Sequence, residues 1–277
     1  MKLVTFRRKS AAFTQVGAVE GADVKVLASY PDMITALGAG LEKLKRSAAA
    51  ATSIPLTDVE LLAPIPKPPK LICIGLNYRD HAIESNMAIP TVPTVFCKFT
   101  TSIVGPGANV VLPKKSTQPD YEAEFAFVIG KGGRYIKAVD WAQHVIGYTM
   151  VNDVSARDVQ LATSQWVMGK NFDTFAPMGP YVTTADEIAD PHNLRIGLTL
   201  NGQTLQDSNT QELIFKVPEL IEHLSSILTL ETGDVVSTGT PKGVGFARKP
   251  PIYLKAGDEM TVFVEGLGEL KNPIVGE

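Results

Sequence analysis

The chain has 277 residues, of which 44% are hydrophobic and 20% charged, and its formal net charge is −3. These values are typical of a globular protein with one large domain, or a large and a small one. Without a dense stripe of lysine and arginine, nothing suggests a nucleic-acid partner. No apolar run approaches the ~20 residues that cross a bilayer, so we expect no membrane association.

The cysteine content bears on the compartment. Cys73 and Cys97 are the only cysteines, and one pair in a chain of this length favours a reducing compartment over a disulfide framework. Residues 1–6 resemble a short strand rather than an apolar signal segment. We therefore expect a cytoplasmic protein. Cys73 lies in an apolar run and is expected to be a packed thiol rather than a nucleophile.

The first 70 residues contain short elements and then a stiff segment. Strands are expected over residues 2–6, 13–19 and 24–27. A helix is expected to begin near Pro31 and Asp32, with apolar residues at i, i+3 and i+4 through Leu44. Four prolines then fall within residues 64–69, a composition that is stiff and joins sheets poorly. We predict a small N-terminal domain over residues 1–66 and a larger domain over 67–277.

Strand patterns dominate the larger domain. The expected strands cover residues 71–74, 95–99, 109–112, 121–129, 145–151, 194–200, 234–237 and 259–264. Two helices are expected, over residues 154–165 and 217–226. Strands and helices do not alternate as a doubly wound parallel sheet requires. The predicted fold class is α+β and β-rich, with a rolled or barrel-like sheet.

Two glutamates one residue apart are the most informative local feature. Tyr121, Phe125 and Phe127 alternate with polar or small residues, so Glu122 and Glu124 share one face of a strand. Adjacent carboxylates repel, and folding them together requires water, a proton or a cation between them. Mg²⁺ and Mn²⁺ take oxygen ligands of this kind. The alternative is a half-exposed strand with two solvated glutamates.

Further candidates each have a functional and a structural interpretation. Asp153 follows an apolar run and is either a third oxygen ligand or a helix cap. His81 and Glu84 are three residues apart, as in a base oriented by a carboxylate or in an ordinary surface pair. Lys170 lies between a glycine and an aromatic-rich loop, and is either functional or solvated. Thr240 lies in a glycine-rich loop able to bind a carboxylate, although the spacing is not that of a phosphate loop.

The order of these motifs resembles the fumarylacetoacetate hydrolase family. The matching patterns are G-x-N-Y-x-x-H-x-x-E at 75–84, Y-E-x-E at 121–124 and N-D-x-S-A-R-D-x-Q at 152–160. G-K-x-F-D-T-x-x-P-x-G-P at 169–180 and S-T-G-T-P-x-G-V-G at 237–245 continue the match, which covers roughly residues 70 to 277. The resemblance implies a mixed β-roll with a small N-terminal α/β domain, and a homodimer.

The resemblance also implies roles for individual residues. It implies Mg²⁺ or Mn²⁺ ligands at three positions: Glu122, Glu124 and Asp153. It implies a water-activating dyad of His81 and Glu84 on a lid-like segment, with Lys170 near the metal. Arg157, Gln160 and Thr240 match positions that hold the carboxylate and oxo groups of the substrate. The substrate's side chain is expected to meet residues of the lid and of three loops: Ile83, Asn86, Met87, Ile89, Trp166, Phe172 and Phe246.

Three functional hypotheses follow. The main one is a metal-dependent hydrolase that cleaves a carbon–carbon bond in a 2,4-dioxo acid of the acylpyruvate type through a metal-stabilised enolate. The alternative uses the same site to decarboxylate oxaloacetate, or to isomerise or hydrate a 2-oxo acid. A third is a binding module without catalysis, which predicts no turnover and no affinity for a divalent ion. In the first two, the partner is a small 2-oxo acid.

Overall fold

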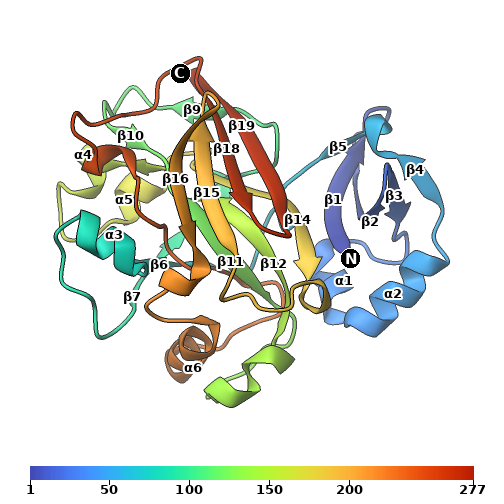
Figure 1. Cartoon of the computed structure of the whole chain (residues 1–277). Helices are drawn as coiled ribbons and strands as arrows, with labels where there is room; N and C mark the ends of the chain where they lie inside the picture. Colours follow the sequence, from blue (N-terminus) through green and yellow to red (C-terminus); the bar gives the residue numbers. More distant parts are fainter.

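The computed structural model describes all 277 residues, and most of its regular structure consists of strands (Figure 1). The largest sheet has twelve strands, ten of them in the order β4-β3-β2-β1-β14-β12-β11-β17-β6-β7, with β5 paired to β1 and β8 to β14. In that order, their bounds are Ser53–Pro55, Asp23–Val26, Thr14–Glu20, Lys2–Arg8, Ala176–Thr184, Val145–Asn152, Ala123–Ile129, Val235–Ser237, Leu71–Gly75 and Thr94–Lys98, with β5 at Val59–Leu61 and β8 at Ile103–Val104.

Two smaller sheets complete the strand inventory. A five-stranded sheet has the order β16-β15-β18-β19-β9, and β10 pairs with β13. Their bounds are Gln203–Asn209, Arg195–Leu200, Glu259–Val264, Gly268–Gly276, Val110–Leu112, Pro119–Asp120 and Ser155–Ala156. Most pairs are antiparallel, but β17–β6, β14–β8 and β19–β9 are parallel. The β-rich mixed architecture predicted from the sequence is therefore confirmed.

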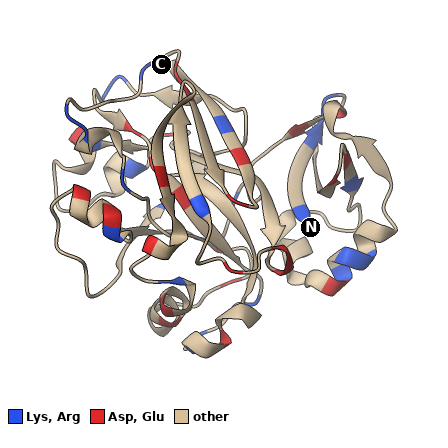
Figure 2. Cartoon of the chain, in the orientation of Figure 1, with Lys and Arg blue, Asp and Glu red and all other residues tan.

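The helices are short. The α-helices are α1 Met33–Gly38, α2 Leu41–Ala49, α3 Arg79–Glu84, α4 Arg157–Gln160, α5 Val167–Lys170 and α6 Val217–Ile227. Single turns of 3₁₀ helix occur at η1 Leu56–Asp58, η2 Thr100–Ser102, η4 Ala185–Glu187, η5 Thr210–Glu212 and η6 Gly245–Ala247, with a longer η3 at Ala138–Gln143. No helix is long and apolar enough to cross a membrane. Acidic and basic residues are interspersed along the chain (Figure 2).

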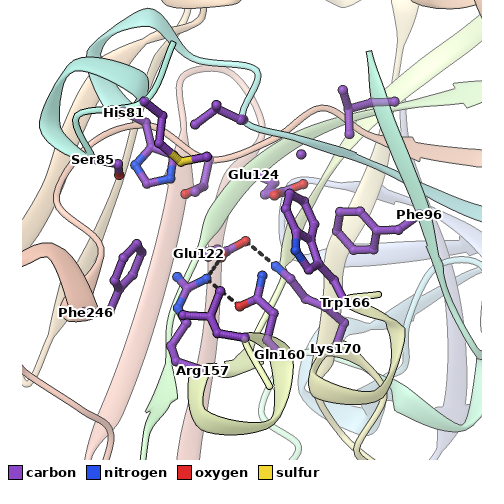
Figure 3. A pocket seen from close by; sticks show the side chains of 16 residues that line it. His81, Ser85, Phe96, Glu122, Glu124, Arg157, Gln160, Trp166, Lys170 and Phe246 are labelled. Carbon is purple, nitrogen blue, oxygen red and sulfur yellow. Dashed lines mark hydrogen bonds and ion pairs between the residues drawn. The ribbon is translucent and has the colours of Figure 1, made fainter. Parts of the chain in front are cut away.

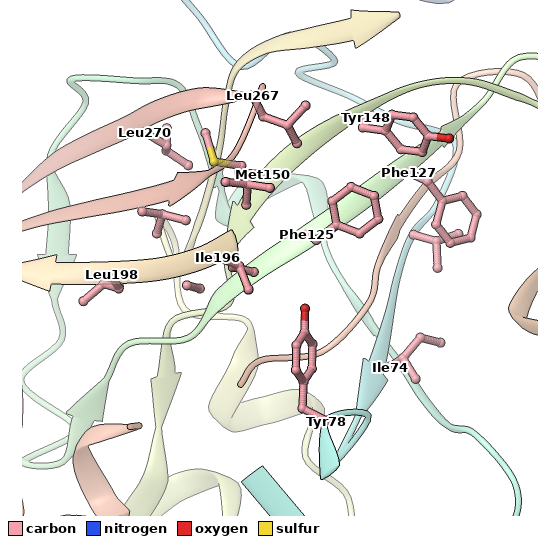
Figure 4. Packing of buried hydrophobic residues seen from close by; sticks show 14 of the residues in the cluster. Ile74, Tyr78, Phe125, Phe127, Tyr148, Met150, Ile196, Leu198, Leu267 and Leu270 are labelled. Atoms are coloured by element: carbon pink, nitrogen blue, oxygen red, sulfur yellow. The ribbon is translucent and has the colours of Figure 1, made fainter. Parts of the chain in front are cut away.

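The main core lies where the five-stranded sheet packs on β11 and β12 (Figure 4). Phe125 of β11 stacks on Tyr148 of β12, with ring centroids 5.3 Å apart. Ile196 and Leu198 of β15 belong to the same buried cluster. This face-to-face packing is how two sheets exclude water from their inner faces. The core therefore fixes β11, the strand that carries Glu124.

The opposite face of β11 is also buried. Val128 belongs to a second cluster, together with Met33 and Leu37 of α1. All seven residues of β11 are consequently buried. The N-terminal strands, blue in Figure 1, belong to the large sheet, which they join where β1 pairs with β14 through Lys2–Thr183 and Leu3–Val182. The boundary predicted after residue 66 falls in the proline-rich segment, which contains no helix or strand, and it stays a prediction.

Two expected helices differ from the structure. The helix expected from Pro31 onward is divided into α1 and α2, because Gly40 adopts φ 81°, a left-handed conformation that interrupts an α-helix. The helix expected over residues 154–165 is reduced to the single turn of α4, because Ser155 and Ala156 pair with β10 instead. Strand β14 was also missed, since Pro177, Gly179 and Pro180 hid it. Strands β16 and β19 were missed as well.

Candidate active site

Three acidic residues meet at one end of the β11–β12 pair. Glu124 lies in β11 and Glu122 directly precedes that strand, whereas Asp153 directly follows β12. The antiparallel register pairs Ala123 with Asn152, so the three acids are neighbours across the ladder. One oxygen of each carboxylate lies within 4.8 Å of the others. The convergence expected for a cation site is therefore present.

The burial of these acids removes the structural alternatives. Glu122, Glu124 and Asp153 are 5%, 1% and 0% exposed, so the glutamates are not solvated on a half-exposed strand. Asp153 does not cap the helix that follows, because Ala156 precedes α4 and no side chain caps that helix. A buried carboxylate requires a proton, a hydrogen bond or a cation to compensate its charge. The neighbouring side chains supply part of this compensation.

Two buried lysines contact the acidic cluster. Lys170, at the end of α5, donates from Nζ to Glu122 Oε2 at 2.7 Å and to Asp153 Oδ2 at 2.6 Å. Because Lys170 is only 2% exposed, it is not the solvated lysine of the alternative interpretation. Lys98, at the end of β7, donates to Asp153 Oδ1 at 2.7 Å and to two backbone carbonyl oxygens, those of Val154 and Lys170. Sequence reasoning missed Lys98, whose only signal is a charge within an apolar strand.

The acids of this cluster differ in their pKa values. Burial by itself would raise the pKa of Glu122, but the cations of Lys170 and Arg157 outweigh it and lower this pKa to about 2. Burial and the carboxylates of Asp153 and Glu122 raise the pKa of Glu124 well above its usual range. Burial opposes the charged form of Lys170, but the same two carboxylates outweigh it and raise its pKa. Glu122 is thus anionic and Lys170 cationic, whereas Glu124 takes up a proton more readily than an ordinary glutamate.

These residues fit a hard divalent cation. In and beside this cluster, the buried charges are four carboxylates and three cations: Asp120, Glu122, Glu124, Asp153, Lys98, Arg157 and Lys170. The carboxylate without a basic partner is Glu124, whose Oε2 accepts from Ser237 Oγ at 2.5 Å and from Gly239 N at 3.1 Å. Carboxylate oxygens are the donors that Mg²⁺ and Mn²⁺ take. The acidic triad could therefore hold such an ion through Glu122, Glu124 and Asp153.

A histidine faces the acids from the other side of the cleft (Figure 3). His81 lies on α3 and is 8% exposed, and its Nδ1 is 3.6 Å from Glu84 Oε2. The Glu84 carboxylate also accepts from Gly243 N at 2.9 Å. Burial would raise the pKa of Glu84, but His81 and the Gly243 N–H outweigh it and lower this pKa. An anionic Glu84 therefore stands on the Nδ1 side of the imidazole, which leaves Nε2 available to the cleft.

Helix α3, with which the lid-like segment begins, is docked in this structure. Asp80 Oδ2 accepts from Ser208 Oγ of β16 at 2.6 Å. Arg79 Nη1 donates to the carbonyl oxygen of Leu213 at 3.4 Å. Together with the bond from Gly243 to Glu84, these contacts hold the helix against the five-stranded sheet and its loops. The position of His81 is therefore set by tertiary contacts at both ends of its helix.

The residues expected to bind substrate lie beside the acids. Arg157 and Gln160 share the single turn of α4, and Arg157 Nη1 is 2.6 Å from Glu122 Oε1 and 3.0 Å from Gln160 Oε1. Thr240 Oγ accepts from the side-chain amide of Gln206 at 2.8 Å. Gln206 is fully buried in β16 and was missed, because nothing in its local sequence separates it from a surface glutamine.

One cleft unites the predicted residues. They line it directly, except Glu84 and Asp153, which lie outside its lining. The remaining lining is mostly apolar: Ile74, Gly75, Leu76, Ser85, Met87, Phe96, Leu161, Trp166 and Phe246. Of the residues expected to meet the substrate's side chain, those found in the lining are Met87, Trp166 and Phe246, and those absent from it are Ile83, Asn86, Ile89 and Phe172. Charged groups thus form one part of the cleft and apolar side chains the other.

Comparison with known proteins decides the family. The family model described as "Fumarylacetoacetate (FAA) hydrolase C-terminal" matches residues 70–275. The chain belongs to the fumarylacetoacetate hydrolase family. This membership confirms the resemblance drawn from the motifs, and it identifies the cleft as the candidate active site of a family whose solved members share the fold described above.

Members of the fumarylacetoacetate hydrolase family with different names are similar to this chain. The "Oxaloacetate tautomerase FAHD2A, mitochondrial" of Bos taurus is 49% identical over 232 residues, which cover 82% of this chain and 74% of the relative. The fumarylacetoacetate hydrolase of Exiguobacterium antarcticum has a TM-score of 0.90 and 34% identity, with 100% of both chains covered. Maleylpyruvate hydrolase of Sphingobium, solved with manganese(II) and pyruvate, has a TM-score of 0.84 and 30% identity, with 100% and 99% covered.

The names of these family members correct the expected location. The bovine protein is named as mitochondrial, and so is the human oxaloacetate tautomerase FAHD2A, which is 48% identical over 240 residues. The cytoplasmic expectation is therefore contradicted. Its physical basis was too coarse: a low cysteine count separates reducing from oxidising compartments, and it does not distinguish the cytoplasm from another reducing compartment.

Proposed function

We propose that the protein is a divalent-cation-dependent enzyme that interconverts the enol and keto forms of a short 2-oxo dicarboxylic acid of the oxaloacetate type. One observation carries this proposal: an imidazole oriented by a carboxylate lines the same cleft as two of three convergent carboxylates. The name of the bovine relative, an oxaloacetate tautomerase, supports this reaction over carbon–carbon bond hydrolysis.

The acidic side of the cleft would hold the cation and the polar end of the substrate. Mg²⁺ or Mn²⁺ bound by the triad would act as a Lewis acid toward the carboxylate and 2-oxo oxygens. Lys170 keeps its proton, because its pKa is raised by the carboxylates that outweigh its burial. It is therefore a fixed positive charge rather than a base. Arg157, Gln160 and Thr240 contribute donors on the same side of the cleft.

The opposite side would move the proton. Conversion of the enol to the keto form removes a proton from the enol oxygen and adds one at C3, so no water is consumed and no bond between heavy atoms breaks. His81 is the titratable group in the lining that lies outside the acidic cluster, and Glu84 orients it through Nδ1. Nε2 is then free to carry a proton to or from C3. General acid–base help of this kind is worth about 10²–10⁴ in rate.

The test follows the enol absorbance of oxaloacetate with Mg²⁺ or Mn²⁺, after subtraction of the uncatalysed and metal-catalysed backgrounds. His81→Ala should slow tautomerisation by about 10²–10⁴. His223→Ala, a histidine on α6 outside the cleft lining, is the matched control and should leave the rate unchanged. A rate that survives both EDTA and the double substitution Glu122→Ala/Glu124→Ala would refute the proposal.

A second candidate is hydrolysis of an acylpyruvate-type 2,4-dioxo acid. The Sphingobium relative, named a maleylpyruvate hydrolase and solved with manganese(II) and pyruvate, favours it. In this reaction, His81 would remove a proton from a water that attacks the 4-carbonyl carbon. The C3–C4 bond would then break to give pyruvate and a second carboxylic acid. Pyruvate release from acetylpyruvate without oxaloacetate tautomerisation would select this candidate, and the reverse pattern would exclude it.

A further inference from the structure

Asp120 is a fully buried carboxylate beside the cleft that has no role in the chemistry above. It lies in β10, and its Oδ2 accepts from Arg157 Nε at 2.9 Å and lies 2.8 Å from Arg157 Nη2. Its two oxygens also accept from the backbone N–H groups of Tyr121, Gly245 and Phe246, at 2.9, 2.7 and 3.0 Å. One carboxylate thus joins β10, α4 and the loop that contains η6.

The loop is fitted closely around this carboxylate. A Cβ atom on Gly245 would lie 2.5 Å from Asp120 Oδ1 and 1.9 Å from the carbonyl oxygen of Ile252, so no larger residue fits without displacement. The ring of Phe246 lies against the Arg157 guanidinium, 4.5 Å from its carbon to the ring centroid. Asp120 therefore holds both the arginine and the aromatic ring that covers it.

This arrangement decides which donors Arg157 presents to the cleft. Nε donates to Asp120 Oδ2 and Nη2 lies 2.8 Å from the same oxygen, so Nη1 is the nitrogen that contacts Glu122 Oε1 and Gln160 Oε1. A guanidinium forms its strongest pairs with carboxylates through two parallel N–H bonds. If Asp120 lost its charge, Arg157 would be free to pair in this way with Glu122, and it would then compete with Lys170 for Oε2 and contact both oxygens of a proposed cation ligand.

We propose that Asp120 is a positioning residue, which acts through Arg157: it limits the guanidinium to a single contact with Glu122, so that Glu122 can still bind a divalent cation, and it holds Nη1 where a substrate can meet it. The cation part stands on the contacts of the acidic cluster, whereas the substrate part rests on the proposed function. Asp120 itself is absent from the cleft lining. It therefore touches neither ligand, and its effect must be transmitted through the side chain that it holds.

Asp120→Asn is the informative variant, because an asparagine keeps one oxygen acceptor, enough for the N–H groups of Tyr121 and Gly245, and loses the charge that holds the guanidinium. We expect Mn²⁺, measured by the electron paramagnetic resonance of the free ion, to bind at least about tenfold more weakly, the scale of one charge-assisted hydrogen bond. Oxalate binding in the presence of saturating Mn²⁺ should weaken as well. This binding is measured by the fluorescence of Trp166 in a Trp141→Phe background. For oxaloacetate, KM should rise more than kcat falls.

Asp234→Asn is the matched control. Asp234 is also a fully buried carboxylate, but it pairs with Lys70 at 3.0 Å and lies outside the cleft lining. Its substitution should lower the Tm and leave Mn²⁺ and oxalate binding unchanged. If Asp120→Asn behaves in the same way, with a lower Tm and unaltered ligand binding, Asp120 is merely structural and the proposal is overturned.

A double-mutant cycle tests whether Asp120 acts through Arg157. In an Arg157→Gln background, Asp120→Asn should weaken Mn²⁺ and oxalate binding little further, whereas additive losses would overturn the proposal. If Asp120→Asn does not fold, Gly245→Ala perturbs the same contact from the loop and should weaken the binding of both Mn²⁺ and oxalate. Wild-type affinities in that variant would overturn the proposal. Absence of oxaloacetate turnover in the wild type would refute the proposed function alone, since Mn²⁺ and oxalate binding still decide the role of Asp120.

Discussion

Binding of a divalent cation to the acidic cluster should release a proton from Glu124. Burial and the carboxylates of Asp153 and Glu122 raise the pKa of Glu124 well above its usual range, so without a cation this carboxyl tends to be protonated. A cation ligand must be ionised, and the proton and the cation therefore compete for the same oxygens.

The structure sets the number of protons involved. The pKa of Glu122 is about 2, because Lys170 and Arg157 outweigh its burial, so Glu122 is already ionised at neutral pH and releases nothing. Lys170 remains protonated, since the carboxylates raise its pKa against the effect of burial. One proton per ion is therefore expected. Below the raised pKa of Glu124 the apparent Kd should increase about tenfold for each pH unit lost, and above it the Kd should be constant.

Calorimetric Mn²⁺ titrations in two buffers of different ionisation enthalpy would count the released protons, and a pH series would give the slope. Glu124→Gln should bind the ion more weakly and without proton release. Glu269→Gln, at an exposed glutamate of β19, should retain the release of the wild type. A wild-type protein that releases no proton at any pH where Mn²⁺ binds would contradict the reasoning.

Three further predictions concern stability and the cleft. Burial and Lys216 lower the pKa of His192, whose Nε2 accepts from a backbone N–H at the start of α6. The free energy of unfolding should therefore fall as the pH drops below about 6.5. In thermal melts at several pH values, His192→Gln should flatten this dependence. Gly75→Ala places a Cβ 2.3 Å from the ring of Trp166, so the tryptophan emission and the KM should both shift, and unchanged values in steady-state assays would exclude the close contact. Phe125→Ala removes a fully buried ring and should cost about 3–5 kcal/mol in urea denaturation, with a loss below about 1 kcal/mol speaking against this core.

The local patterns that predicted the site were those in which neighbours along the chain are neighbours in space. Alternation placed Glu122 and Glu124 on one face of a strand, and the i, i+3 spacing placed His81 beside Glu84; both arrangements are present. The full burial of β11 could not be predicted, because it depends on a distant sheet on one face and on α1 on the other. The alternation within a strand predicts which residues share a face, but it does not reveal which other elements pack on that face.

The residues that were missed are those defined by tertiary contacts. Lys98 reaches the site from β7, Gln206 from β16 and Asp120 from β10. Apart from the residue type, nothing in the neighbouring sequence marks any of them as part of a site. Strand β14 was hidden because Pro177 and Pro180 lower the strand propensity, although the large sheet accommodates them. Local preference was overridden there by the pairing of β14 with β12 and β1.

The cleft is lined by strand residues, whose sequence is strongly constrained, and by loop residues, whose sequence is less constrained. Glu124 belongs to a strand buried on both faces, where a shift of one residue would move every side chain to the wrong side. Met87, Trp166 and Phe246 instead come from connecting segments, whose sequences can change without disturbing the sheets. A scaffold of this kind can keep the strands that carry the acidic triad while the loop residues that line the rest of the cleft change, so that a change of substrate need not disturb folding.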